Sequence, residues 1–151
     1  MAYTFAICPA DRVGVVRLTG RVEGRAILAA ARELAAHPDW RPGFRAVWDA
    51  SRMGSLDVSL SDVAALVRQE RQLQARGEVG DLVVVARDSI WLSLVRLFDR
   101  RMGPDGRTLW TVPTPQDALS LLGIDALPPA DREAAQRPRQ PSGRPRSGSP
   151  K

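Results

Sequence analysis

The sequence has too little cysteine and histidine for a disulfide framework or a zinc site. Cys8 is its only cysteine and His37 its only histidine, so no metal-binding spacing of these residues can be assembled. A Ser-His-Asp catalytic arrangement would have to use His37, which we expect at the exposed end of a helix, and no GxSxG turn accompanies it. We therefore expect no enzymatic activity, no bound metal and no cofactor.

Long apolar runs and glycine-rich phosphate loops are also missing. No stretch approaches the roughly 20 apolar residues that cross a bilayer, and MAYTFAICPADR lacks a basic leader followed by a long apolar run. We therefore expect no membrane insertion and a cytoplasmic location. Gly103 and Gly106 bracket a turn that follows a helix, whereas a phosphate loop follows a strand.

Lysine is almost absent, and the positive charge is concentrated at one end of the chain. Of the net charge of +5, residues 128–151 carry +4, from six cations and two carboxylates, which leaves about +1 for residues 1–127. A nearly neutral body argues against a nucleic-acid-binding domain. A weak contact of the basic tail with nucleic acid or an anionic surface remains open.

Composition divides the chain into a domain of residues 1–127 and a tail of residues 128–151. The tail holds half of the twelve prolines, together with arginine and serine, and has almost nothing to bury. Such a segment does not offset the entropy of ordering it, so we expect it to be disordered. The remaining residues suffice for one domain with a hydrophobic core.

Two hydrophobic periodicities alternate along the body. Period-2 or continuous apolar segments predict strands, and 3.6-residue spacing predicts helices. The run LVVVA, at 82–86, has no polar alternation and is typical of a strand that is covered on both faces. The strands are expected at 3–8, 13–19, 44–50, 82–86 and 108–112, and the helices at 23–37, 62–76, 89–102 and 115–122.

This ββαβαβαβα order predicts the fold class. Single helices between consecutive strands require crossover connections, which are almost always right-handed. The sequence therefore predicts an α/β domain with a single-layer mixed, mostly parallel sheet of about five strands and about four helices.

The stretch VWDASRMGSLDVSLSD, at 47–62, leads from a strand into a helix. Ser59 precedes the apolar-periodic helix, and Asp62 follows three residues later, which is the pattern of a capping box. Ser61 is an alternative cap. A helix cap by itself accounts for Ser59, Ser61 and Asp62, and no further function is needed to explain them.

The same stretch resembles the signature of the STAS domain, the family named after sulfate transporters and anti-sigma-factor antagonists. In the bacterial antagonists the loop reads approximately D-S-S-G-L, and its second serine is phosphorylated. Here 57-DVSL-60 occupies that place, so the resemblance implies that Ser59 is the phosphoacceptor. Val58 and Leu60 replace the first serine and the glycine of that motif. The loop around Ser59 would then act as a switch loop, with Asp49, Ser51, Arg52 and Asp57.

Four further patterns resemble the SpoIIAA-like (STAS/SEC14-like) bacterial proteins. They are the opening hairpin ending in Gly20, HPDWRPGF before a strand ending in VWDAS, 91-WLSLVRLFDRRM-102, and PTPQDALSLLG. The resemblance implies a SpoIIAA/STAS-like fold, which is akin to lipid-carrying SEC14-type domains.

The expected helix at 89–102 has an apolar arc wider than one core contact requires. One interpretation places it between the sheet and another helix. The other gives one of its two apolar stripes a binding role, facing a partner subunit or lining an apolar pocket. That stripe comprises Trp91, Val95, Phe98 and Met102.

Together these features predict a non-enzymatic STAS-like interaction or regulatory module with a protein partner. The alternative is a carrier or sensor of a small apolar ligand in a SEC14-like pocket. The sequence leaves open whether the protein forms a homodimer.

Overall fold

The computed structural model describes residues 2–77, 79–104 and 106–129. Most of the expected tail, residues 130–151, lies outside the described residues. Five strands and four helices follow one another in the order ββαβαβαβα. They are β1 (Tyr3–Cys8), β2 (Val13–Glu23), α1 (Gly24–Ala36), β3 (Arg45–Asp57), α2 (Leu60–Ala75), β4 (Leu82–Val85), α3 (Ser89–Met102), β5 (Leu109–Val112) and α4 (Pro115–Leu122).

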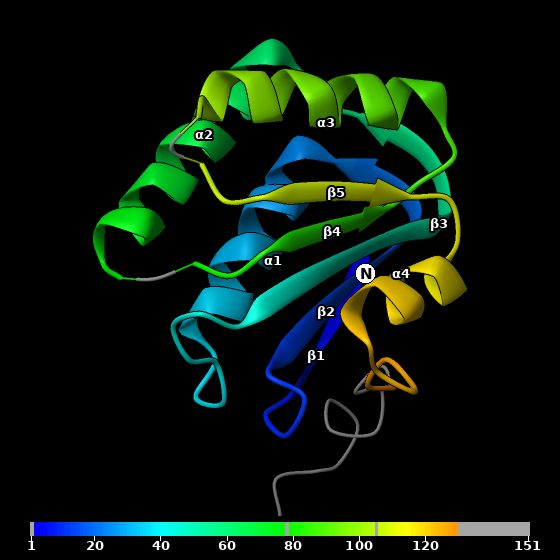
Figure 1. The fold of residues 1–151 in the computed structure, drawn as a ribbon. Helices are drawn as coiled ribbons and strands as arrows, with labels where there is room; N and C mark the ends of the chain where they lie inside the picture. The colour runs from blue at the N-terminus through cyan, green and yellow to red at the C-terminus, as the bar shows by residue number, and fades with distance from the viewer. Residues whose placement is uncertain (1, 78, 105, 130–151) are drawn as a thin grey trace, which may run out of the picture.

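The strands form one mixed sheet in the order β1-β2-β3-β4-β5 (Figure 1). β1 pairs with β2 antiparallel, and the three remaining pairs are parallel. This is the predicted fold class, which is confirmed. Because β2, β3 and β4 are parallel, helices α1, α2 and α3 all begin at the edge where these strands end, which we call the carboxyl edge. The opposite edge, where β3, β4 and β5 begin, is the amino edge.

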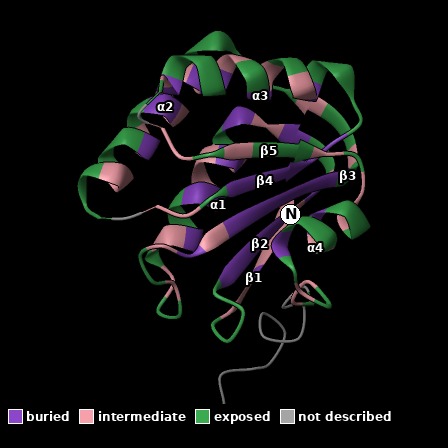
Figure 2. Cartoon of the chain, viewed as in Figure 1, coloured by how far each residue is buried: buried purple, intermediate pink, exposed green. Residues whose placement is uncertain are grey.

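Helices cover both faces of the sheet unequally. Helices α1, α2 and α3 pack on one face, and α4 packs on the other (Figure 1). Along β3, Ala46, Trp48 and Ala50 face the three-helix side, and Val47 faces α4. All four residues of β4 are buried, which confirms the interpretation of its continuous apolar run. Figure 2 shows that many buried residues lie in the central strands and that β5 is more exposed.

The structure corrects the expected ends of β2 and β3. The second strand does not end at Gly20, and residues 51–57 are not a loop: β2 continues to Glu23 and β3 to Asp57 as a parallel ribbon. The register shifts twice along this ribbon, and Gly20 has a φ of 63°, a left-handed value that glycine adopts readily. The polar sequence of this segment carries no strand periodicity. Its extended form depends on backbone pairing with β2, which lies far away in the sequence.

Local signals place the ends of α4 as predicted, whereas α2 begins at Leu60, two residues before the expected start at 62. Thr114 accepts a hydrogen bond from the Asp117 amide, Pro115 follows at the first helical position, and Gly123 ends α4 with a φ of 69°. Asp88 caps α3 through a hydrogen bond from the Trp91 amide at 2.9 Å. These bonds satisfy backbone groups that a helix end would otherwise leave unpaired.

Candidate functional site

Ser59 forms the predicted capping box at the start of α2. Its hydroxyl accepts from the Asp62 amide at 3.1 Å, and its own amide donates to Oδ2 of Asp62 at 2.9 Å. Ser61 is already inside the helix, so it is not the cap, and its hydroxyl lies 2.8 Å from that of Ser59. Ser59 is exposed. The arrangement holds a solvent-accessible hydroxyl in a fixed position at the carboxyl edge.

Gly24 brings the start of α1 against this capping box. A methyl group on Gly24 would lie 2.7 Å from Cβ of Asp62 and closer still to the Asp62 carboxylate. Only a residue without a side chain therefore allows the two helices to begin this close together. Sequence reasoning missed this contact, because the two residues are 38 positions apart and neither belongs to a shared motif.

The residues assigned to the switch loop do not converge on Ser59. Asp49, Ser51 and Arg52 line a groove of about 630 Å³ on the α4 face of the sheet, together with Arg17, whereas α2 covers the opposite face. The buried Asp49 accepts from the Ser51 amide at 2.9 Å. The pKa of Arg17 is lowered, chiefly by burial, while the Asp49 carboxylate opposes that shift.

Asp57 alone of the four residues is close to Ser59 in the chain. Its carboxylate pairs with Arg21 of β2 at 3.3 Å, and both side chains are exposed. An exposed pair of this kind adds little stability. Arg21 nevertheless adds a cation near the start of α2 that could not be identified from the sequence.

The stripe of α3 that was predicted to bind a partner or line a pocket is buried. Trp91, Val95, Phe98 and Met102 belong to the core between α3 and the sheet. The structure thus contradicts the hypothesis that this stripe faces a partner subunit, because α3 presents it to the sheet. The exposed apolar residue of this helix is Ile90, which is 65% exposed.

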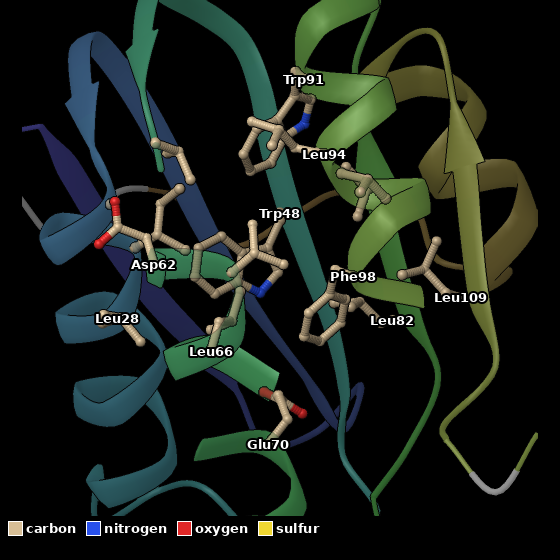
Figure 3. A pocket seen from close by; sticks show the side chains of 16 residues that line it. Leu28, Trp48, Asp62, Leu66, Glu70, Leu82, Trp91, Leu94, Phe98 and Leu109 are labelled. Atoms are coloured by element: carbon tan, nitrogen blue, oxygen red, sulfur yellow. The ribbon is translucent and has the colours of Figure 1, made fainter. Parts of the chain in front are cut away.

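A small cavity lies under α3, and we call it the apolar cavity (Figure 3). It has a volume of about 70 Å³ and is bounded by α1, α2, α3, Trp48 of β3 and residues of β4 and β5. Trp91, Val95 and Phe98 line it, and Met102 does not. Val58 and Asp62, which flank Ser59, line it as well, so the predicted serine and the predicted pocket adjoin.

The size of the apolar cavity limits what it can hold. A dry cavity of about 150 Å³ accommodates benzene, and ligand pockets commonly measure about 300 Å³ or more. A lipid therefore does not fit without movement of α3. Trp91 Nε1 is buried and has no hydrogen-bond partner among the described residues.

Two further features are absent from the described residues. No group of three or more His, Cys, Asp or Glu side chains there is arranged to hold a metal ion. No helix in that part of the chain combines the length and apolarity that a membrane span requires.

Comparison with known proteins shows the fold. The unphosphorylated form of SpoIIAA, an anti-sigma factor antagonist, matches with a TM-score of 0.50 at 15% identity, over 81% of this chain and 98% of SpoIIAA. An uncharacterised DUF3478-family protein from Shewanella loihica PV-4, with a SpoIIAA-like fold, matches with a TM-score of 0.49 at 16% identity. That match covers 80% of this chain and 92% of the other protein. No family model and no curated protein matches the sequence. The SpoIIAA/STAS-like fold expected from the sequence is thereby confirmed.

Proposed function

We propose that this chain is a non-enzymatic interaction module that binds a protein partner at the carboxyl edge of its sheet. The observation that carries the proposal is the composition of that edge. Ser59 presents a fixed, exposed hydroxyl, and the adjacent Leu60 is 64% exposed at the first position of α2. The fold shared with an anti-sigma factor antagonist supports the same interpretation.

A second exposed apolar residue supports this placement. Ile90 occupies the first turn of α3, which begins at the same edge as α2. α2 and α3 run side by side, since the Arg71 side chain donates to the Arg101 carbonyl at 2.8 Å. Large apolar side chains exposed beside polar groups are typical of protein interfaces, where a few such residues carry most of the binding energy.

Ser59 is the position at which we propose that this edge is regulated. A phosphate on its hydroxyl would gain from the positive end of α2. It would also meet the Asp62 carboxylate, which lies 2.9 Å from the Ser59 amide, and like-charge repulsion would open the capping box. Phosphorylation would thus alter the shape and the charge of the proposed interface together.

Incubation with native-host extract and ATP, followed by mass spectrometry, tests the regulatory step. We expect a phosphate on the peptide containing Ser59, and its loss in Ser59→Ala. A peptide without phosphate in the unaltered chain would remove this step and leave the binding proposal standing.

Capture from a native-host lysate tests the binding itself. We expect a stoichiometric protein partner, with at least tenfold less recovered by the double variant Leu60→Gln/Ile90→Gln. Leu121→Gln is the matched control, because Leu121 is 43% exposed on α4, on the other face of the sheet. Equal capture by the double variant and the unaltered chain would contradict the proposal.

A carrier or sensor of a small apolar ligand is the second candidate function. The apolar cavity supports it through its lining and through Trp91 Nε1, which has no partner among the described residues and offers one hydrogen bond to a ligand acceptor. Its volume of about 70 Å³ restricts the ligand to a few heavy atoms. Titration with acetone, which is small and carries one hydrogen-bond acceptor, monitored at the Trp91 indole N–H signal, tests this function; an unchanged signal would exclude it.

A further inference from the structure

A second cavity lies at the amino edge of the sheet, and we call it the Arg107 cavity. It has a volume of about 220 Å³, is partly open to solvent, and is lined by the C-terminal ends of α1 and α2, by β3 and by the segments that precede β3, β4 and β5. Glu70 and Trp48 line both this cavity and the apolar cavity, so the two adjoin beneath α2. Figure 3 shows Glu70 at the end of the apolar cavity away from Trp91.

A buried ion pair forms part of its wall. Nη2 of Arg107 donates to Oε2 of Glu70 at 3.0 Å, and the two side chains are only 10% and 9% exposed. Nε and Nη1 of Arg107 are buried without a hydrogen-bond partner among the described residues. Three of the five guanidinium N–H donors thus have no partner in the part of the chain that the structure describes. Unpaired charged donors are costly to bury, so this arrangement favours an additional acceptor.

The rest of the lining of the Arg107 cavity combines aliphatic side chains with three aromatic ones. Trp40 and Phe44 meet edge to face, with ring centroids 5.5 Å apart, and Trp48 also contributes. The ionisable described residues of the lining are Arg76, Arg107 and Glu70. Within the described lining, two cations and one carboxylate leave a charge of +1, which matches a monoanion better than a phosphate dianion.

We propose that the Arg107 cavity binds a small aromatic carboxylate. Its carboxylate would accept from Nε and Nη1 of Arg107, and its ring would lie among Trp40, Phe44 and Trp48. The volume of about 220 Å³ exceeds the roughly 150 Å³ that accommodates benzene. Both nitrogen atoms are shielded from solvent, so binding requires the guanidinium to turn toward the cavity. This site is independent of the proposed partner-binding edge.

Titration of the full chain with phenylacetate and with 2-phenylethanol tests the proposal. The alcohol matches the acid in size and ring but lacks its charge. The readout is the set of indole N–H signals in ¹⁵N NMR spectra. The sequence contains four tryptophans, so four such peaks are expected. We expect the acid to shift Trp40 and Trp48, with a Kd at least tenfold lower than that of the alcohol, and to leave the exposed Trp110 unchanged. Equal affinities, or an equal shift at Trp110, would overturn the proposal.

Two variants separate ligand binding from structural support. Glu70→Gln removes the carboxylate that competes for Arg107 and keeps its shape, so we expect phenylacetate to bind at least threefold more tightly. Arg107→Lys removes the planar set of donors, and we expect at least tenfold weaker binding. Arg71→Lys, on α2 outside the cavity lining, is the control and is expected to bind as the unaltered chain does. Unchanged affinity in folded Glu70→Gln would overturn the proposal even if Arg107→Lys failed to fold.

Discussion

The carboxyl and amino edges of the sheet are stabilised in different ways. At the carboxyl edge, Ser59 and Asp62 are three residues apart, and the side chain of each accepts a hydrogen bond from the backbone amide of the other. This pair lies next to solvent. At the amino edge, Glu70 and Arg107 are 37 residues apart, buried, and only partly paired. Local hydrogen bonding thus leaves the first edge exposed to solvent, whereas the second edge depends on long-range packing around charged groups.

Of the substitutions at either edge, removal of the Arg107 side chain should cause the largest loss of stability. Arg107→Ala leaves the Glu70 carboxylate buried without its partner, so we expect a loss of about 3–5 kcal/mol in the free energy of unfolding. The double variant Arg107→Met/Glu70→Met should recover most of that loss, because no charge remains buried. Urea unfolding measures both, and a loss below about 1 kcal/mol in Arg107→Ala would show that the pair contributes little.

A methyl group at position 24 should cause the next largest loss of stability. Gly24→Ala forces the new Cβ against Asp62, so we expect a loss of about 1–3 kcal/mol by urea unfolding, although alanine otherwise favours a helix. In an Asp62→Gly background the same substitution should cost much less, because both the carboxylate and the Cβ atom that it would meet are gone. Equal costs in the two backgrounds would contradict the proposed contact.

Substitution of Ser59 tests the capping box at the carboxyl edge. Ser59→Ala removes the acceptor for the Asp62 amide, and we expect a loss of about 1 kcal/mol, which is typical of an N-cap. Ser61→Ala is the matched control, and its effect should stay within about 0.5 kcal/mol. If the two substitutions cost the same, Ser59 is not the residue that caps α2.

Tyr3 offers a check on a long-range contact away from both edges. Its hydroxyl donates to Oε2 of Glu33 at 2.8 Å, and burial, that hydrogen bond and the Glu33 charge raise the pKa of Tyr3 to about 12. Tyr3 is the only tyrosine, so absorbance at alkaline pH follows it alone. Glu33→Gln should lower the midpoint toward the ordinary pKa of about 10.

The same pKa fixes the sign of a small stability effect. Between pH 10 and 12 the folded chain holds a proton on Tyr3 that the unfolded chain releases, so stability falls as the pH rises through this window. Tyr3→Phe should remove that slope. A midpoint near 10 in the unaltered chain would contradict the Glu33 contact.

The sequence predicted the features that depend on local order. The α3 helix begins at Ser89 and ends at Met102 as expected, and the Ser59 capping box is present, because caps and helix periodicity act within a few residues. The extension of β3 to Asp57 and the pairing of Glu70 with Arg107 were missed. Both depend on chain segments that only the folded structure brings together, and neither leaves a periodic signal.

Hydrogen–deuterium exchange of the chain bound to its captured partner tests the central proposal most directly. We predict that partner binding protects backbone amides at residues 59–62 and 89–91, at the starts of α2 and α3. Amides of α4 and of the segment before β5 should exchange as they do in the free chain. Protection confined to α4 or to the amino edge would contradict the assignment of the partner to the carboxyl edge.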